Sequence, residues 1–526
     1  MTASTTPGEQ PGKLGWPRRA TVGLLAAARR NKLFTGALAA GALLRLIALI
    51  GFPGALWFAG DSYVYIGAAL RPQPNLSKTT GYSLFLRALL PFHSLTLVVA
   101  LQHLMGLAVA VIIYWLLRKH QVSRLWSTIA TLPVLFDGFM IEDEHLIMAE
   151  ALFTFAVMVA LLLVLRTRRV SWWVALITGL LLGYAAIVRT EGAPFLALFP
   201  LFLLLRGFRD YGWKKLRAWA APVVLALGCL APVAGYALWF QSFTGHLGLT
   251  ESTGYYLWGR VSSFADCAVI KPAGAEAAIC PKEPVRHRTA PGNFIWHAPE
   301  VHKDLPGGPV TPANNKLLTD FAIHAVEAQP LGYVKAVAHG LVMAVSPQRE
   351  QYPSTGTVYY YYFHRHRLGI PHHSWIDGGY APDDWVAYGH AKPGRVIEPF
   401  ATVMIGYQRA HLYTWGPLLA IILAIGLGGV IRVRRPVRAW RLTRRGSPLS
   451  WSPRGTTMLP WVTAIVMLVT PIALADFDYR YLLPVIPFAC LAAGLAFAPS
   501  RRQGAGPVAP SSGEPHEATT PEITPV

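Results

Sequence analysis

The strongest constraint on this chain is a series of apolar runs, each close to the length of a membrane span, that are separated by shorter polar connections. Examples are residues 33–52, 95–117 and 151–165. Crossing the hydrocarbon core of a bilayer, about 30 Å thick, takes about 20 mostly apolar residues in a helix. Hydrophobic residues make up 53% of the 526 and charged residues only 14%, a balance that disfavours a soluble fold. The sequence therefore predicts an all-α polytopic membrane protein.

Read along the chain, the apolar runs predict about ten transmembrane helices. The first run is interpreted as an uncleaved span, because no cleavage site of small residues follows it before polar sequence resumes. Within the fifth run, Gly179 and Gly183 form a GxxxG pattern that is typical of close helix packing. The predicted spans are residues 33–52, 95–117, 124–139, 150–165, 171–188, 193–205, 218–240, 411–431, 457–475 and 482–498.

Basic residues mark every second connection between the apolar runs. Cytoplasmic loops of membrane proteins carry an excess of Lys and Arg, so this pattern predicts both termini in the cytoplasm of a multi-pass plasma-membrane protein. The exterior connections are then 53–94, 137–150 and the long stretch 241–410. The basic clusters lie at residues 29–32, 118–119, 166–169, 209–217, 432–445 and 501–502.

The formal net charge of +20 raises the alternative of nucleic-acid binding. A nucleic-acid-binding protein gathers its charge on one soluble face, with aromatic platforms for the bases. Here the basic residues lie between apolar runs instead. The expected partners therefore include membrane lipids and exclude nucleic acid.

The composition divides the chain into five regions. Both terminal regions are rich in Pro, Gly and small polar residues and are predicted to be disordered. The regions are a cytoplasmic N-terminal segment (1–32), an N-terminal transmembrane module with exterior loops (33–240), an extracytoplasmic loop region (241–410), C-terminal transmembrane helices (411–498) and a cytoplasmic tail (499–526).

The long exterior region holds two cysteines, Cys267 and Cys280. The other two cysteines of the chain, Cys229 and Cys490, lie inside apolar runs, where they are expected to be small core residues. Disulfides form in oxidising compartments outside the cytoplasm. A Cys267–Cys280 disulfide is therefore expected.

One carboxylate lies shortly after the first predicted span. Asp61 is flanked by aromatic residues, from Trp57 to Tyr65. A partly desolvated Asp near the outer membrane surface is suited to act as general base toward an acceptor hydroxyl. The alternative is that Asp61 caps a helix beginning at Ser62, while the aromatic residues belong to the interfacial belt. The residues alone leave both interpretations open.

The second exterior connection is rich in acidic groups, with Glu142, Asp143, Glu144 and His145 in succession and Glu150 beyond them. Carboxylates and a histidine are ligands that a divalent cation accepts. Alternatively the acids mark a solvated helix start, where they face the positive end of the helix dipole; we expect this of two of the three consecutive acids. Glu150 begins the apolar run itself, so its burial requires a partner.

Three arginines lie at membrane depth: Arg45, Arg189 and Arg480. A guanidinium recognises phosphate or carboxylate with two parallel hydrogen bonds, so Arg480 at the outer end of the last span suits a lipid phosphate. The alternatives are pairing of Arg480 with Asp476 or Asp478, pairing of Arg189 with Glu191, and snorkelling of Arg45 to the interface. We favour a functional role for Arg480 and internal pairing for Arg189.

The long exterior region also contains a run of aromatic residues, 359–363, followed by His364, His366, His372 and His373. This run fits a sugar-stacking platform or a metal site. It also fits interfacial anchors, since tyrosines gather at bilayer surfaces, and the His spacings match no zinc pattern. The sequence leaves these interpretations open.

Four short motifs occur in a fixed order: Gly60-Asp61-Ser62-Tyr63, the acidic loop ending at Glu150, the stretch 188–192, and the stretch 478–484. Together they resemble the GT-C superfamily of membrane glycosyltransferases. The resemblance is closest to bacterial relatives of the protein O-mannosyltransferases and of the aminoarabinose transferases that modify lipid A, and the segment 259–281 looks like actinobacterial members. It covers nearly the whole membrane part, and implies a GT-C-like bundle with a large extracytoplasmic loop.

The resemblance implies transfer of one sugar from a polyprenyl-phosphate donor to a cell-envelope glycan, lipid or protein, on the exterior face and with inversion. Asp61 would be the base and Glu150 a second catalytic carboxylate. Ser62 stands where an acidic residue commonly follows the Asp in the eukaryotic mannosyltransferases, which leaves the metal and the acceptor unassigned. The donor phosphate would be held by Arg480, Tyr481 and Arg45, and an acceptor or divalent metal cation by Glu142, Asp143, Glu144 and His145.

Two other functions share this layout. A transporter or flippase of lipid-linked sugars also carries intramembrane arginines, but such proteins often show two related halves, and no internal repeat is visible here. A ligase or polymerase that moves whole lipid-linked glycans differs in the size of its donor. A nucleotide-sugar enzyme is not indicated, because no glycine-rich phosphate loop or dinucleotide fingerprint occurs.

Overall fold

The computed structural model of the chain describes residues 28–58, 60–167, 169–366, 369–370, 379–390, 396–431 and 453–499. Most of the two terminal segments predicted to be disordered, the basic cluster 432–445, and His372 and His373 lie outside the described residues. Within the described ranges every regular element is a helix, and the only β pairing is a single bridge between Leu56 and Leu146. The all-α fold class is confirmed.

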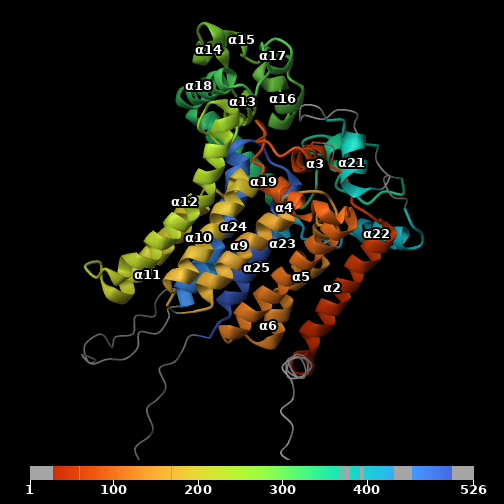
Figure 1. Ribbon diagram of the computed structural model, residues 1–526. Helices are drawn as coiled ribbons and strands as arrows, with labels where there is room; N and C mark the ends of the chain where they lie inside the picture. The colour runs from red at the N-terminus through yellow and green to blue at the C-terminus, as the bar shows by residue number, and fades with distance from the viewer. Residues whose placement is uncertain are drawn as a thin grey trace, which may run out of the picture.

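A bundle of long apolar helices forms the body of the molecule (Figure 1). In the part of the chain that the structure describes, six helices are long and apolar enough to cross a membrane: Lys32–Gly51, Leu95–Lys119, Thr190–Tyr211, Arg217–Thr244, Thr456–Leu474 and Tyr479–Ala496. Each predicted span except 124–139 coincides with one helix of the bundle. These helices are α2 (Lys32–Gly51), α5 (Leu95–Lys119), α9 (Glu150–Leu165), α10 (Trp172–Val188), α11 (Phe195–Tyr211), α12 (Arg217–Thr244), α23 (Gly416–Ile431), α24 (Pro453–Leu474) and α25 (Val485–Ala496).

The predicted span 124–139 is wrong as a single helix. The segment forms three short helices instead, α6 (Arg124–Ile129), α7 (Leu132–Phe136) and α8 (Gly138–Asp143). Pro133 lies at the start of α7, where its missing N–H costs no helical hydrogen bond. Asp137 then begins a new helix, because its Oδ1 accepts hydrogen bonds from the amides of Phe139 and Met140. The apolar run is therefore divided by its own capping residues.

The GxxxG pattern lies where α10 packs against α12. A Cβ atom added at Gly179 would meet the carbonyl oxygen of Leu225, and one added at Gly183 would meet that of Cys229. Helix backbones approach this closely only where small residues face the partner. The prediction of helix packing at this pattern is confirmed.

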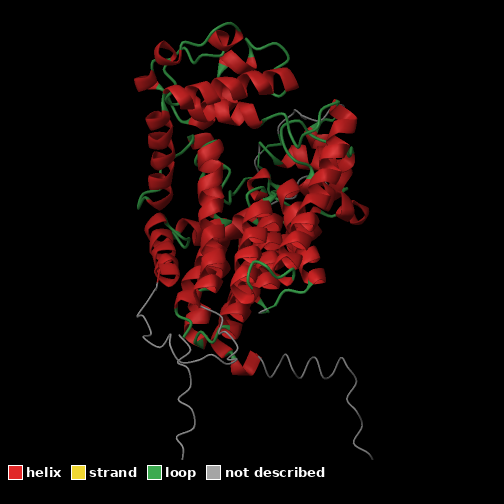
Figure 2. Ribbon diagram, turned by 90° about the vertical axis from the view of Figure 1, so that its left-hand side faces the viewer, coloured by secondary structure: helices red, strands yellow, loops and turns green. Residues whose placement is uncertain are grey.

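A second helical layer covers one end of the bundle (Figures 1 and 2). We call this layer the cap; it comprises residues 253–328. Trp258, Val301, Leu318 and Phe321 form the centre of its own buried apolar cluster. The Cys267–Cys280 disulfide lies within it, as predicted. Its helices are α13 (Thr253–Ser262), α14 (Cys267–Ile270), α15 (Ala275–Ala278), η3 (Val285–His287), α16 (Pro291–His297), α17 (Pro299–His302) and α18 (Pro312–Ala328).

Asp476 ties the cap to the bundle at the connection between α24 and α25. Its Oδ2 accepts a hydrogen bond of 2.7 Å from the amide of Gly292 in α16. Its Oδ1 accepts one of 2.6 Å from the Tyr352 hydroxyl and lies 3.8 Å from Nη1 of Arg260 in α13. Asp476 therefore does not pair with Arg480, contrary to one of the alternatives above. The remaining helices near this end are α3 (Ser62–Leu70), α4 (Gly81–Leu89), α19 (Pro330–Val345), α20 (Thr355–Tyr359), α21 (Ala381–Gly389) and α22 (Phe400–Arg409).

We expect Gly183→Leu to lower the thermal stability of the purified protein, because the new side chain has no space against the backbone of α12. Overpacking of this kind costs about 1–3 kcal/mol. The matched control is Gly235→Leu, since Gly235 lies on α12 with nothing within 4 Å of an added Cβ. Thermal unfolding in detergent should show a lower midpoint for the first variant only. Equal midpoints would contradict the close packing of α10 on α12.

Candidate functional site

Asp61 directly precedes the first residue of helix α3, but its side chain does not cap the helix. It occupies the N-cap position, yet its side chain makes no capping hydrogen bond. Instead the carboxylate, which is only 4% exposed, accepts a hydrogen bond of 2.5 Å from Nη1 of Arg480 and forms an ion pair with Lys78. The helix-cap interpretation is therefore wrong, and the carboxylate lies between two cations.

Lys78 was not singled out from the sequence. It lies in the turn between α3 and α4, which Asn75 shapes by accepting hydrogen bonds from the amides of Ser77 and Lys78 at 2.8 and 3.1 Å. Its ammonium also lies 5.9 Å from the ring centroid of Tyr65. One feature of the sequence could have pointed to it. Lys78 lies in the connection 53–94, which is predicted to be exterior, and Lys is depleted in exterior loops.

The surroundings of Lys78 act on its ionisation in opposite directions. Burial, together with the positive charges of Arg480 and Arg189, lowers the pKa of the Lys78 ammonium. The carboxylate of Asp61, in direct contact, favours the charged form. Burial thus disfavours the charged ammonium, whereas the ion pair with Asp61 favours it.

Arg480 lies on the short helix η4 (Tyr479–Leu482) that precedes α25. Besides Asp61, its guanidinium faces Asp478, with Nε 3.5 Å from Oδ2, and Glu150, with Nη1 3.9 Å from Oε1. Its carbon Cζ lies 4.9 Å from the ring centroid of Phe58. Of the two pairings considered from the sequence, only the one with Asp478 occurs.

Glu150 and Arg189 extend this arrangement into the bundle. Glu150 is the first residue of α9 and is only 1% exposed. Arg189, at the end of α10, forms ion pairs with Glu150 and, at 2.9 Å, with Glu191. The predicted pairing of Arg189 with Glu191 is thus present, and the partner that a buried Glu150 requires is Arg189.

Tyr481 lies between the two arginines. Its ring centroid is 5.2 Å from Cζ of Arg480 and 5.7 Å from Cζ of Arg189, and its hydroxyl is 3.5 Å from Nη2 of Arg480. We call the ion-paired side chains and this tyrosine the charge cluster. Four carboxylates face three cations in it. The cluster consists of Asp61, Lys78, Glu150, Arg189, Glu191, Asp478, Arg480 and Tyr481.

A pocket of about 350 Å³ adjoins the charge cluster between α5, α8, α9 and the start of α25. Asp143 and Glu150 both line it. Burial and the negative charge of Glu150 raise the pKa of the Asp143 carboxyl well above its ordinary value. Asp143 therefore tends to hold a proton, which makes it a hydrogen-bond donor toward whatever enters the pocket.

The structure corrects the expectation that Arg45 helps to hold a donor phosphate. Its guanidinium is 1% exposed, and Nε and Nη2 bind the two oxygens of Glu144 at 2.7 and 2.8 Å. The remaining donors bind the carbonyl oxygens of Gly41, Leu135 and Val134 at 3.2, 2.9 and 3.2 Å. Because all donors of the guanidinium are occupied, Arg45 neither binds a ligand nor reaches the interface.

Glu144 and His145 also have structural partners. Glu144 binds Nδ1 of His103 at 2.8 Å in addition to Arg45, and Nε2 of His145 lies 2.8 Å from the carbonyl oxygen of Phe52. Within the described residues, no group of three or more His, Cys, Asp or Glu side chains is placed to hold a metal ion. The acidic connection therefore does not supply the metal-ligand set considered from the sequence.

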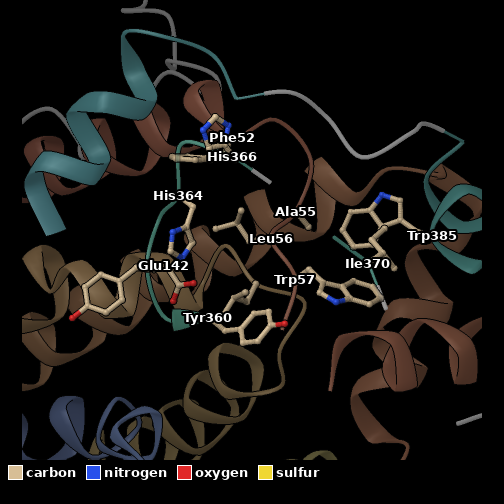
Figure 3. A pocket seen from close by; sticks show the side chains of 12 residues that line it. Phe52, Ala55, Leu56, Trp57, Glu142, Tyr360, His364, His366, Ile370 and Trp385 are labelled. Atoms are coloured by element: carbon tan, nitrogen blue, oxygen red, sulfur yellow. The ribbon is translucent and has the colours of Figure 1, made fainter. Parts of the chain in front are cut away.

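Glu142 does not line the pocket that adjoins the charge cluster. It lines a separate pocket of about 490 Å³ together with residues of the segments 52–57 and 360–370 (Figure 3). The five candidates of the acidic connection thus separate into three environments. Glu150 and Asp143 adjoin the charge cluster, Glu144 and His145 belong to the buried network of Arg45, and Glu142 lies in the second pocket.

Arg349 is a further cation that the sequence did not single out. Its Cζ lies 3.7 Å from the ring centroid of Phe139 and 4.4 Å from that of Tyr479. It lines a third pocket, of about 430 Å³, near the start of α23. In the part of the chain that the structure describes, Arg349 makes no ion pair, so aromatic contacts hold it.

Comparison with known proteins gives limited likenesses. The sequence matches no protein-family model and no curated protein sequence. Among solved structures, the apo form of the Archaeoglobus fulgidus oligosaccharyltransferase is similar over 88% of this chain and 50% of that chain, at 12% identity and a TM-score of 0.38. The same protein tethered to an acceptor peptide gives 12% identity and a TM-score of 0.36, over 88% and 49%. This chain spans about half the length of that protein.

If Arg45 has the structural role described here, Arg45→Met should strongly destabilise the protein, because it leaves Glu144 buried and unpaired. Breaking one partner of a buried pair costs about 3–5 kcal/mol. The double variant Arg45→Met/Glu144→Gln should recover part of that loss in thermal unfolding. If Arg45→Met instead kept the stability of the wild type but lost affinity for a polyprenyl phosphate, Arg45 would be a phosphate ligand after all.

Proposed function

We propose that this protein is a membrane glycosyltransferase of the GT-C type. In this proposal it moves one sugar from a polyprenyl-phosphate donor to a hydroxyl of a cell-envelope acceptor, on the extracytoplasmic face. The observation that carries the proposal is the contact of the buried Asp61 carboxylate with both Lys78 and Arg480. A candidate base and two candidate phosphate ligands thereby share one site at the cap-covered end of the bundle.

The donor chemistry favours this location. A polyprenyl phosphate is too apolar to leave the bilayer, so the protein must bind its sugar at the membrane surface, where the helices end. Arg480 offers a planar guanidinium that suits phosphate oxygens, and Lys78 offers a compact charge. Tyr481 adds a hydroxyl beside Arg480. In the proposed complex the phosphate shares these donors with Asp61.

The proposed reaction is a single displacement at the anomeric carbon. Asp61 accepts the proton of the acceptor hydroxyl as the hydroxyl oxygen bonds to that carbon, and the bond from the carbon to the phosphate oxygen breaks. The electron pair of the broken bond stays on the polyprenyl phosphate, whose developing charge Lys78 and Arg480 stabilise. Base and leaving group lie on opposite sides of the sugar, which inverts its configuration.

The other members of the charge cluster position these groups in the proposal. Glu150 is held by Arg189 and faces Nη1 of Arg480, so it restrains the guanidinium. Asp143 is placed in the adjoining pocket to donate a hydrogen bond to the acceptor. No step is assigned to a divalent cation, because the acidic side chains considered as ligands do not converge.

We expect Asp61→Asn to abolish sugar transfer while preserving donor binding. Asn cannot accept the proton, and removal of one negative charge leaves Lys78 and Arg480 free for the phosphate. The measurement compares release of free polyprenyl phosphate with the Kd of the same donor, using purified protein in detergent. Asp320→Asn is the control, since Asp320 lies on the cap surface and pairs only with Lys316.

Two results would contradict this account of Asp61. Near-native turnover of Asp61→Asn would show that another group takes the proton. A wild-type protein that binds the donor and moves it across vesicles without ever releasing polyprenyl phosphate would be a flippase, because release requires chemistry.

We further expect Lys78→Met to weaken donor binding, since it removes a charge-assisted contact with the phosphate. A hydrogen bond to a charged group is worth about 2 kcal/mol, which corresponds to about a 30-fold rise in the donor Kd. Lys78→Arg should recover much of the affinity, and Lys282→Met on the cap surface should have no effect. An unchanged donor Kd in Lys78→Met would remove Lys78 from the proposed phosphate site.

A further inference from the structure

The second pocket has walls that differ from those of the charge cluster. Its lining includes several aromatic rings: Trp57 and Trp385 lie with ring centroids 5.3 Å apart at 64°, and Tyr360 and Tyr362 line it as well. Figure 3 shows the carboxylate of Glu142 at one side of the pocket and the indole rings at the other. The pocket is open to solvent and encloses, together with that open space, about 490 Å³ of empty volume.

Two buried polar atoms in this pocket have no hydrogen-bond partner among the described residues. One is Oε1 of Glu142, whose residue is 2% exposed, and the other is Nε1 of Trp57, whose residue is 6% exposed. Leaving a buried donor or acceptor unpaired costs about 1–3 kcal/mol. Native structures contain few such groups, and an unpaired group in a pocket points to a ligand that is absent.

The unpaired atoms and the rings together define the ligand chemistry. A hydroxyl group both donates and accepts, so adjacent hydroxyls of one ligand satisfy the Glu142 carboxylate and the Trp57 N–H. The C–H faces of a sugar ring are apolar and pack on aromatic rings. Burial raises the pKa of the Glu142 carboxyl well above its ordinary value, and a hydroxyl pairs with that group in either protonation state.

A metal ion fits this pocket less well. His364 is the histidine nearest to the Glu142 carboxylate in Figure 3, and its Nε2 lies 2.7 Å from the carbonyl oxygen of Tyr359. The ring contact between His364 and Tyr359, with centroids 3.9 Å apart, further fixes that imidazole. Among the described residues no third ligand joins Glu142 and a histidine here.

One aromatic ring separates this pocket from the charge cluster. Phe58 follows Trp57 directly, and its ring lies 5.7 Å from that of Tyr360, which lines the pocket. The centroid of the Phe58 ring also lies 4.9 Å from Cζ of Arg480. Phe58 therefore contacts both a ring of the pocket and the guanidinium of the charge cluster.

We propose that the pocket formed by Trp57, Glu142, Tyr360 and Trp385 is a subsite for a neutral saccharide, and that it holds the acceptor. The saccharide assignment stands on the pocket itself. The assignment as acceptor rests on the proposed function, and it makes the favoured acceptor a glycan or glycolipid.

The test is saturation-transfer-difference NMR on protein in lipid nanodiscs, with a panel of methyl glycosides of neutral hexoses and pentoses as probes. We expect at least one glycoside to bind, and its affinity to fall at least tenfold in Glu142→Met and in Trp57→Phe. Glu142→Met also removes an unpaired buried acceptor, so its thermal midpoint should equal or exceed that of the wild type. If Glu142 had a structural role instead, its replacement by Met would lower the thermal midpoint.

The two proposals fail in distinguishable ways. Glycoside binding that is equal in both variants and the wild type, or its absence at millimolar concentration, overturns the subsite whatever the donor assay shows. Binding of Zn²⁺ that Glu142→Met abolishes, without glycoside binding, also overturns it in favour of a metal site. Glycoside binding that depends on Glu142 and Trp57, in a protein that never releases polyprenyl phosphate, supports the saccharide site and removes its role as acceptor site.

Discussion

The contact of Asp61 with Arg480 is the interaction on which the arrangement of the site depends. It joins positions 419 residues apart, the start of α3 and the start of the last helix of the bundle. Buried charges are costly unless paired, so each member of the charge cluster constrains its neighbours. Lys78 fixes the turn before α4, and the Glu150–Arg189 pair fixes α9 against α10. Five positions along the chain are thereby held at one end of the bundle.

The connection between α24 and α25 links this cluster to the cap. Asp476 and Asp478 lie two residues apart and hold different partners. Asp476 binds the amide of Gly292 in the cap, whereas Asp478 accepts a 2.6 Å hydrogen bond from Tyr361 and faces Arg480. One short connection therefore contacts both the cap and the arginine. Beneath the cluster, the saturated network of Arg45 and Glu144 supports the acidic connection from α2.

Much of this arrangement could be predicted from the sequence, because apolar runs and charged residues within them have few physical outcomes. Asp61, Glu150 and Arg480 were placed together as exterior candidates, and they do converge. The span at 124–139 was wrong because hydropathy ignores Pro133 and the capping carboxylate of Asp137. The number of about ten spans is not established, since six helices among the described residues meet the length and hydropathy required.

The rest depends on contacts between distant segments, which local patterns do not contain. Arg45 is indistinguishable in sequence from a ligand until Glu144 is found against it. Lys78 sits in an ordinary polar turn, and the saccharide pocket draws Trp57, Glu142 and Tyr360 from three separate segments. Such sites become visible only when the fold has brought their unpaired polar atoms together.

The most direct test of the account is a structure of the protein with a polyprenyl phosphonate analogue of a sugar donor, which binds but cannot be cleaved. The account predicts that the phosphonate oxygens contact Lys78 and Arg480, with the anomeric carbon between the phosphorus and the carboxylate of Asp61. A phosphonate bound at Arg349, in the pocket of about 430 Å³ near the start of α23, with Asp61 far from the sugar, would contradict it.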